Sequence, residues 1–422
     1  MIIVGENQNN AGAETNQQML RKMHLRQIFD LVLANKQVSR AWIAQQLGLS
    51  STAVASLADE LIESGMLIEK GLGDLKTAGR KPVIFEINSA GQQIVTVCID
   101  LNKIDFVLYN LDCTEKECIR MKFSGADYVQ YIRHILSQSK ELDPQKVAAL
   151  CVTLPAFADP GSHRLLLNIL DISDDMAFME ELSGLFPDAV LVVGNDSATF
   201  SYAEKEFISA PGVDNLIYIN YSYGIGAGII VGGRMFNGVH GSPGEIGHMS
   251  IDVNGPQCEC GNKGCLERMT SLAVILRQVK AKIQQGGYSM VSGMLNENQN
   301  DITIDMICEA FHQKDFLVTE VIQDNARKLS VGIKNIISIF NPQEIVLGGH
   351  AHKFGKQFYD MILEHMSGMD AWRLTHDLKI RYTGIDENGS NLGIAKYYLD
   401  HILSFDGRTV EQNIQQNNGG EC

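Results

Sequence analysis

One histidine and three cysteines lie close together in a glycine-rich stretch of the chain. They are His248, Cys258, Cys260 and Cys265. A Cys3His set is a common ligand set for a closed tetrahedral Zn²⁺ site, in which four protein ligands leave no position for a metal-bound water. The spacing therefore predicts structural zinc. The alternatives are a group of free thiols or a Cys258–Cys260 disulfide, and the absence of an export signal argues against the disulfide.

Two carboxylates flank these ligands. Glu245 precedes His248 by three residues and Glu267 follows Cys265 by two. A loop pinned by a metal would also hold these side chains in fixed positions. The order E-x-G-H at 245–248 and C-x-C-G-x-x-G-C-x-E at 258–267 resembles the ROK family, which comprises sugar-responsive repressors and bacterial sugar kinases. The resemblance extends from about residue 20 to residue 404.

The resemblance implies a sugar-binding cleft. Asn195 and Asp196 follow a predicted strand at 190–193, and the family's equivalent pair grips the sugar. Amides and carboxylates suit this task because a pyranose offers vicinal hydroxyls as donors and acceptors. The residues expected to hold the sugar are Asn195, Asp196, Glu245, His248, Glu267 and, on a looser match, Asn168. An alternative role for Asp196 is the N-cap of the following helix. Taken alone, Glu245 and Glu267 could each be a solvated surface residue instead.

The kinases of the family carry two glycine-rich phosphate loops, and both are altered here. The first, expected to read D-I-G-G-T, is D-L-N-K-I at 100–104. The second, expected to read G-T-G-I-G-G-G, is S-Y-G-I-G-A-G at 222–228. Backbone N–H groups cradle phosphate only where no side chain intrudes. We therefore expect no enzyme activity, with Asp196 as the vestigial position of the catalytic base, although the segment 341–349 on the adenosine side persists.

The composition limits the classes of partner. The chain has 422 residues and a formal charge of −15, whereas residues 1–90 hold nine basic and nine acidic residues and are neutral. An acidic bulk repels DNA, so any DNA contact is expected in the N-terminal part. No apolar run is long enough to span a bilayer, and the first residues lack the features of a secretory signal. Together with nine cysteines, these features predict a cytoplasmic protein without membrane contact.

The N-terminal part predicts a winged helix-turn-helix over residues 19–88, after a disordered arm at 1–18. Apolar residues recur at helical spacing from 20 to 36, and two further helices follow Ser39 and Ser50 as caps. Two strands, at 66–69 and 83–87, would form the wing. The residues expected to contact DNA are Ser39, Ser50, Ser51, Thr52, Ala55 and Ser56, with Arg80 and Lys81 of the wing. A helical protein-interaction module is the alternative.

The remainder predicts an α/β fold. Strands and helices alternate over residues 92–404 in two similar halves, about 92–196 and 197–390, followed by a flexible tail at 405–422. This pattern predicts a two-lobed actin-like, ribonuclease-H-like ATPase fold, preceded by the all-α winged helix-turn-helix domain with its hairpin wing. The ROK family has this architecture.

The combined features predict a sugar-responsive transcriptional regulator, a repressor. A homodimer, which could pair further into a tetramer, would place two winged helices on a pseudo-palindromic operator. A monosaccharide or sugar phosphate would bind one state better than the other and so change operator affinity. The alternatives are a sugar kinase that phosphorylates a hexose with ATP and a repressor released from DNA by a protein partner.

Overall fold

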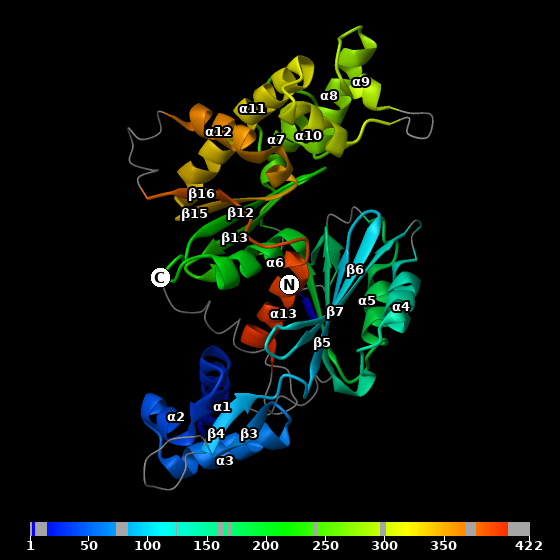
Figure 1. The fold of residues 1–422 in the computed structure, drawn as a ribbon. Coiled ribbons are helices and arrows are strands. Elements are labelled where there is room, and N and C mark those ends of the chain that lie inside the picture. Colours follow the sequence, from blue (N-terminus) through cyan, green and yellow to red (C-terminus); the bar gives the residue numbers. More distant parts are fainter. Residues whose placement is uncertain are drawn as a thin grey trace. The chain divides into compact units, whose positions relative to one another are not determined.

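The computed structural model describes residues 2–4, 15–72, 83–123, 125, 127–158, 164–166, 170–239, 241, 243–295, 301–367 and 377–403. The chain divides into two compact units. Unit 1 comprises residues 1–196 and 391–422, and unit 2 comprises residues 197–390. The chain therefore passes from one unit to the other twice, after Asp196 and after Ser390 (Figure 1). Within the described residues no helix is both long and apolar enough to cross a membrane.

The N-terminal part of unit 1 is a helical cluster with a small sheet. Its helices are α1 (Asn16–Asn35), α2 (Arg40–Leu47) and α3 (Ser51–Glu63). The apolar face of α1 is buried through Leu25, Ile28, Phe29 and Val32. The strands β2 (Val38–Ser39), β3 (Leu67–Leu72) and β4 (Val83–Ile87) pair in the order β2-β4-β3. Helices α1, α2 and α3 and the β3–β4 hairpin form the predicted winged helix-turn-helix.

The predicted disordered arm is wrong at both of its ends. Strand β1 (Ile2–Val4) pairs antiparallel with β11 (Val190–Asn195), and α1 begins at Asn16. The polar composition of the arm obscured two local signals. Three successive β-branched residues favour a strand, and Thr15 with Gln18 forms a capping box that starts α1. Residues 5–14 and the predicted tail at 405–422 lie outside the described residues.

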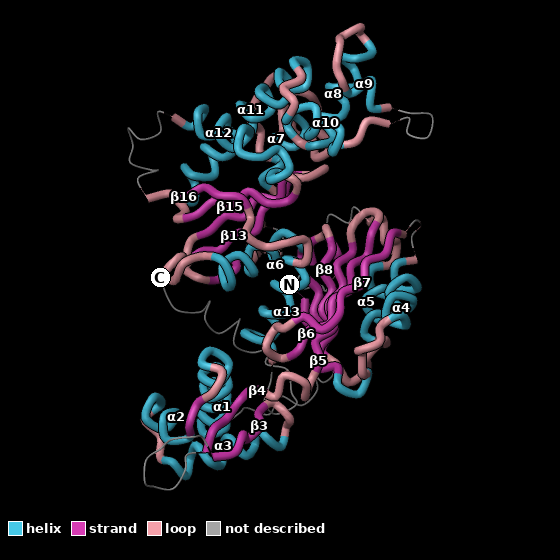
Figure 2. Tube along the Cα trace, viewed as in Figure 1, coloured by secondary structure: helices cyan, strands magenta, loops and turns pink. Residues whose placement is uncertain are grey.

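The larger part of unit 1 is a six-stranded sheet of order β1-β11-β8-β5-β6-β7. Its other strands are β5 (Gln93–Ile99), β6 (Lys103–Asn110), β7 (Glu115–Lys122) and β8 (Val147–Leu154). Strands β11, β8 and β5 are parallel, whereas β5, β6 and β7 are antiparallel. Helices α4 (Tyr128–Gln138) and α5 (Asp175–Ser183) pack their apolar faces into a core on one face, whose members include Ile132 and Leu182 (Figure 2). Short elements η1 (Pro144–Lys146), β9 (Phe157–Ala158) and β10 (Leu165–Leu166) complete this part.

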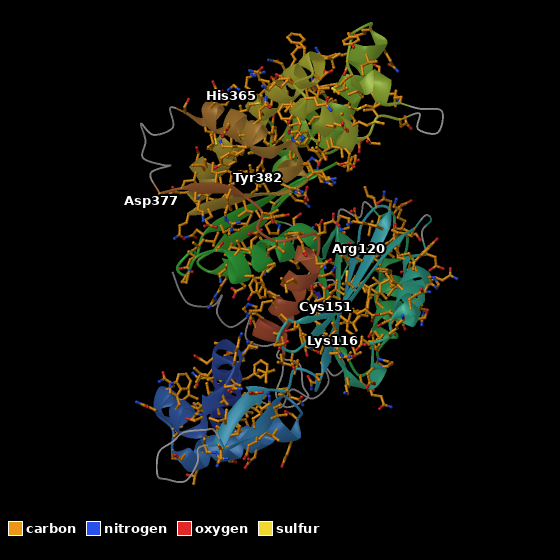
Figure 3. The ribbon with its side chains drawn as sticks, viewed as in Figure 1. Lys116, Arg120, Cys151, His365, Asp377 and Tyr382 are labelled. Atoms are coloured by element: carbon orange, nitrogen blue, oxygen red, sulfur yellow. The ribbon has the colours of Figure 1, made fainter. Side chains whose placement is uncertain are left out.

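The opposite face of this sheet is covered by α13 (Gly389–Tyr397), which continues as the π-helix η6 (Tyr398–Ile402). Cys151 lies on this face of β8, in the interior of the unit (Figure 3). Burial raises the pKa of the Tyr398 hydroxyl, and the neighbouring Cys151 adds to the shift. The closing helix is therefore seated directly on the sheet.

Unit 2 repeats the same strand order. Its sheet is β14-β13-β12-β15-β16, with β12, β15 and β16 parallel and β12, β13 and β14 antiparallel. The strands are β12 (Leu216–Tyr221), β13 (Ile225–Val231), β14 (Arg234–Met235), β15 (Glu344–Gly349) and β16 (Lys379–Tyr382). In both units three antiparallel strands are followed by two parallel ones. This duplication confirms the predicted two-lobed actin-like fold.

Helices cover both faces of the second sheet. On one face lies α6 (Asp196–Ala203), which continues as η2 (Glu204–Ile208), and Phe200 of α6 stacks on Tyr218 of β12. The other face carries the main core of the unit and is covered by a helical layer (Figure 2). That layer contains α7 (Leu266–Thr270), α8 (Leu272–Gln284), α9 (Val291–Met294), α10 (Ile304–His312), α11 (Phe316–Phe340) and α12 (Gly355–Met366), with η3 (Ile246–His248) and η4 (Ala351–Phe354) in the connections.

Candidate functional site

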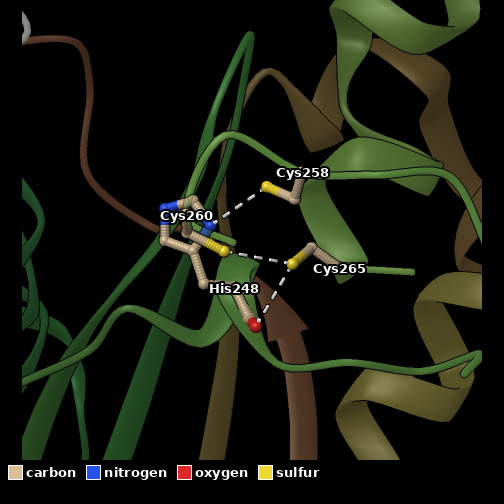
Figure 4. Close-up of side chains that lie close together, drawn as sticks. All are labelled: His248, Cys258, Cys260 and Cys265. Carbon is tan, nitrogen blue, oxygen red and sulfur yellow. Dashed lines mark hydrogen bonds between the residues drawn. The ribbon is translucent and has the colours of Figure 1, made fainter. Parts of the chain in front are cut away.

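The four predicted metal ligands converge in unit 2. The ligand atoms of His248, Cys258, Cys260 and Cys265 all lie within 4.8 Å of one another (Figure 4). The Nδ1 atom of His248 is 3.6 Å from the Sγ atom of Cys258, and the Sγ atoms of Cys260 and Cys265 are 3.5 Å apart. No other group of three or more metal-ligating side chains this close was found among the described residues.

Tight turns in the loop bring these side chains together. The N–H of Cys258 donates to the carbonyl of Asn262, and the N–H of Gly261 donates back to Cys258. Gly264 has φ +64°, and a Cβ there would lie 1.8 Å from the carbonyl oxygen of Asp252, so only glycine fits. These hydrogen bonds form a hairpin that projects Cys258 and Cys260 on the same side. Cys265 then stands at the start of α7.

Sequence reasoning missed one residue of this loop. The side-chain amide of Gln257 donates to the carbonyls of Cys258, Gly261 and Asn262 at 3.1–3.3 Å. It therefore holds the hairpin closed from one side. The only available signal was its position directly before Cys258, and a surface glutamine in a loop gives no stronger one.

Two of the ligand separations match those around a metal of zinc's size. Zn–S bonds of about 2.3 Å and Zn–N bonds of about 2.0–2.1 Å give tetrahedral edges of roughly 3.8 Å between two sulfurs and 3.6 Å between sulfur and nitrogen. The observed 3.5 Å and 3.6 Å lie close to these edges. Burial raises the pKa of the Cys265 thiol to about 12, so a bound cation would be needed to hold it as the thiolate that ligates metals. The donor set therefore suits a thiophilic divalent metal.

His248 presents its other ring nitrogen to a carboxylate. Its Nε2 atom lies 3.4 Å from Oε2 of Glu245, while Nδ1 faces the cluster. Burial, reinforced by the charge of Glu267 and opposed by His248, raises the pKa of Glu245. Glu245 and His248 are each about one-third exposed, at 34% and 31%. The arrangement leaves both side chains accessible to a ligand from outside.

Glu267 is fixed by the neighbouring strand. Its Oε2 atom accepts a 2.8 Å hydrogen bond from the N–H of Ile225 at the start of β13. Gly247 allows this approach, because a Cβ there would lie 2.2 Å from the carbonyl oxygen of Ile225 and 3.1 Å from the Cβ of Glu267. In unit 2 the structure therefore brings Glu245, His248 and Glu267 to one loop cluster.

The other predicted sugar-binding residues belong to unit 1. Asn195 is the last residue of β11, and Asp196 is the first residue of α6. Both are partly exposed at the carboxyl end of the parallel strands, and the amide of Asn195 donates to the carbonyl of Ala156 at 3.4 Å. Asn168 lies outside the described residues.

The glycines that survive from the second phosphate-loop pattern have a packing role. A Cβ at Gly228 would lie 2.2 Å from the carbonyl oxygen of Ser197 and 2.4 Å from the Cβ of Ser201, so β13 approaches α6 closely only because of this glycine. Gly348, in the persistent segment 341–349, is covered by the ring of Tyr218 in the same way. Tyr223 is 47% exposed at the loop between β12 and β13.

Helix α3 presents the predicted DNA-reading side chains. Val54, Leu57, Ala58 and Leu61 are buried, and this leaves Ser51, Thr52 and Ser56 exposed and Ala55 partly exposed. Ser50 caps α3 by accepting from the N–H of Ala53, and Ser39 caps α2 by accepting from that of Trp42. Their hydroxyls therefore have structural partners already. Arg80 and Lys81 of the wing lie outside the described residues.

Two regulators match most of the chain. The chain is 27% identical over 400 residues to the xylose repressor of Caldicellulosiruptor bescii, covering 92% of this chain and 98% of that protein. It is 28% identical over 342 residues to the DNA-binding transcriptional dual regulator NagC of Escherichia coli, covering 79% and 82%.

Solved structures share the fold, and a family model matches most of the chain. A ROK family transcriptional regulator described as a homolog of the E. coli MLC protein superposes with a TM-score of 0.78, at 26% identity over 92% of this chain and 97% of that one. A ROK family glucokinase from Streptomyces griseus, solved with glucose and AMPPNP, superposes with a TM-score of 0.63 at 21% identity, covering 72% and 98%. The model of the ROK family matches residues 96–399. The chain therefore belongs to the ROK family.

Proposed function

We propose that this protein is a sugar-responsive DNA-binding transcriptional regulator that represses genes of carbohydrate metabolism. One observation carries the proposal: the match to the xylose repressor extends over both the winged helix-turn-helix and the ROK domain. The exposed hydroxyl face of α3 supports DNA binding. A symmetric dimer on a pseudo-palindromic operator, able to pair further into a tetramer, and a cytoplasmic location belong to the same proposal.

The proposed effector is a monosaccharide or sugar phosphate. Glu245, His248 and Glu267 would donate hydrogen bonds to sugar hydroxyls or accept them, and Asn195 and Asp196 are further proposed sugar contacts. Hydrogen bonds to charged groups contribute about 1.5–3 kcal/mol each, so a few of them distinguish a bound from an unbound state. A hundredfold preference for one conformation requires only about 2.7 kcal/mol. Asn168 is the least supported member of this set.

The proposed metal is structural Zn²⁺, held by His248, Cys258, Cys260 and Cys265. All four ligands come from the protein, so the metal would crosslink the loop and no catalytic role is assigned to it. With Nδ1 of His248 on the metal, its Nε2 atom would remain free to bind a sugar hydroxyl beside Glu245. The metal would thus position the sugar-binding groups.

Binding measurements test the proposal. The full-length protein would be titrated with duplexes from its own upstream region, alone and with D-xylose, N-acetylglucosamine, glucose and their phosphates. We expect specific binding and at least a tenfold change in operator Kd with one of these sugars. Glu267→Gln should remove the sugar effect, and Glu259→Gln, a change in the same loop, should not. Failure to bind any upstream duplex would refute the proposal, and a response to a protein partner alone would refute the sugar part.

The fold is shared with sugar kinases, so phosphotransfer is the second candidate. The altered loops at 100–104 and 222–228, with Tyr223 in place of a threonine, argue against it. We expect no ATP-dependent phosphorylation of a hexose panel in a coupled assay. Measurable turnover that disappears in Asp196→Asn would establish the kinase alternative instead.

A further inference from the structure

The first helix of the DNA-binding part contacts the last helix of the same unit through one arginine. Arg26 lies in the middle of α1, and each of its side-chain nitrogens has an acceptor. Nε donates to Oδ2 of Asp30 at 2.9 Å, Nη1 donates to the carbonyl of Leu399, and Nη2 lies 3.6 Å from Oδ1 of Asp400. Two of the three acceptors therefore belong to η6, at the far end of the chain.

The contact lies in a partly buried setting. The side chains of Arg26 and Asp400 are 23% and 16% exposed, and Leu399 is fully buried. Lys396, one turn earlier, also pairs with Asp400. Ion pairs at this depth are screened less than surface pairs, so their geometry matters more. Losing the Arg26 guanidinium would remove one partner each from the Leu399 carbonyl and the Asp400 carboxylate in this partly buried setting.

The end of a helix is a suitable acceptor for a guanidinium. Carbonyls in the last turn lack intrahelical partners, and the helix C-terminus carries partial negative charge. The planar fork of arginine can take a carbonyl and a carboxylate at once, which a lysine ammonium cannot reproduce. Arg26 therefore recognises the end of η6 in one orientation.

Each end of this contact is coupled to a part of the regulator that must change state. On the DNA side, Arg21 of α1 donates to Glu60 of α3 at 2.5 Å, and α1 buries its apolar face in the same small core as α3. On the other side, α13 begins with Gly389 and Ser390, which belong to unit 2, and then enters unit 1 at Asn391. The helix formed by α13 and η6, whose last turn contacts Arg26, is thus the second crossing between the units.

We propose that the contact of Arg26 with Leu399 and Asp400 couples the ligand-binding domain to the orientation of the DNA-reading helices. The inference rests on the proposed function. A rearrangement of unit 2 would move the start of α13, and the far end of that helix would carry the movement to α1 through Arg26. Arg26 is a positioning residue in this scheme, because it touches neither the operator nor the sugar.

Operator titrations with a matched set of variants test the coupling. Arg26→Met keeps the apolar stem and removes the fork, Asp400→Asn removes the negative charge that faces the fork from η6, and Asp30→Asn removes only the negative charge within α1. The full-length proteins would be titrated with the upstream duplex, with and without D-xylose, N-acetylglucosamine or glucose. We expect a tenfold or larger sugar effect in the wild type and Asp30→Asn, and less than twofold in Arg26→Met, Asp400→Asn and their double variant. A wild-type sugar response in Arg26→Met would overturn the coupling.

Hydrogen exchange provides a readout that needs no sugar or DNA. In the protein alone, Arg26→Met should speed exchange at least threefold in peptides covering both 16–35 and 391–403, and Asp30→Asn should leave 391–403 unchanged. Equal exchange of 391–403 in the wild type and Arg26→Met would overturn the proposal. Faster exchange throughout the chain would indicate that Arg26→Met is misfolded. Arg26→Lys, which keeps the charge but loses the planar fork, would then be measured instead. Wild-type exchange and a wild-type sugar response in Arg26→Lys would refute the proposed role of the guanidinium. If the wild-type protein binds no upstream duplex, the proposed function is refuted. Hydrogen exchange would still test the contact of Arg26 with Leu399 and Asp400, because it requires no DNA.

Discussion

The two ring nitrogens of His248 face two different groups. Nδ1 faces the cysteine cluster and Nε2 faces Glu245, so the residue joins the predicted metal site to the predicted sugar site. The spacing of one histidine and three cysteines was sufficient to predict that these side chains cluster, because such a set this close in sequence is typical of a metal site. It was not sufficient to find Gln257, since a hydrogen-bonding amide has no characteristic spacing.

Removing one ligand should release the metal and loosen the loop. In Cys258→Ser we expect the zinc content of the purified protein to fall from about one equivalent to below a third, because three remaining ligands bind zinc far more weakly. Metal analysis and thermal melting would measure both effects. Cys308→Ser is the matched control, a buried cysteine outside the cluster, and should retain its zinc. Full zinc content in Cys258→Ser would show that this thiol is not a ligand.

Gly228 has a packing role that the sequence did not reveal. It lies in the altered phosphate-loop pattern at 222–228, and a Cβ there would meet Ser197 and Ser201 of α6. Gly228→Ala should lower the free energy of unfolding by about 1–3 kcal/mol, because the new methyl group meets the backbone of α6. Urea denaturation would measure the change. Gly293→Ala, at a position with no neighbour within 4 Å, should leave stability unchanged or slightly raised, and an equal loss in both variants would contradict the packing role.

At the scale of the elements, strand β16 is held by an ion-pair network that could not be predicted from its sequence. Arg381 on β16 lies between two buried carboxylates, 2.7 Å from Glu204 of η2 and 2.9 Å from Glu344 of β15. Both carboxylates are almost fully buried, at 0% and 3% exposed. The three residues are far apart in sequence, so only the tertiary fold reveals that they meet.

Arg381→Met should be strongly destabilising. Removing the guanidinium takes one cation away from each of two buried carboxylates, and breaking a buried pair costs about 3–5 kcal/mol. Chemical denaturation at pH 7 would measure the loss. Lys379→Met is the control, because Lys379 also reaches Glu344 but is 60% exposed, and we expect a loss of less than about 1 kcal/mol there. Similar losses in both variants would argue against a special role for Arg381.

The same network makes stability depend on pH. Burial alone would raise the pKa of Glu344, but the hydrogen bond from Ser209 and the charge of Arg381 outweigh it and hold the pKa below its ordinary value. The carboxylate therefore stabilises the fold above the unfolded pKa of about 4.3, and this contribution is lost as pH falls through the lower folded pKa. The stability difference between wild type and Glu344→Gln should stay constant from pH 7 to 5 and shrink below about pH 4. A difference that grows on acidification would reverse this assignment.

At the scale of the whole molecule, the acidic bulk and the neutral N-terminal part favour the N-terminal region for the proposed DNA contact. Helix α3 carries no lysine or arginine, so phosphate neutralisation depends on other residues of that region. We expect Arg80→Gln and Lys81→Gln each to reduce the slope of log K against log salt by about one for the operator. Lys70→Gln is the control, because Lys70 is already paired with Glu86 at 2.8 Å. Unchanged slopes in both wing variants would remove the wing from the DNA interface.

Long apolar segments and local caps account for most of what the sequence predicted. The helix capped by Ser50, the core strands of both units and the helix ending at Phe340 follow directly from periodicity and turn residues. The first and last strands, β1 and β16, could not be predicted in this way, because they contain few residues and depend on partners distant in sequence. The contact of Arg26 with Asp400 belongs to the same class, because the two residues lie on separate helices at opposite ends of the chain.

The pairing of β1 affects how the protein should be prepared for ligand binding. Ile2 lies opposite Val193 and Val4 opposite Leu191, so the strand runs antiparallel along β11. Residues added upstream of Ile2 in the same register would continue past Gly194 to Asn195, where β11 ends and α6 begins. A purification tag at the amino terminus would therefore extend toward the groups proposed to hold the effector, and it should be cleaved before any titration.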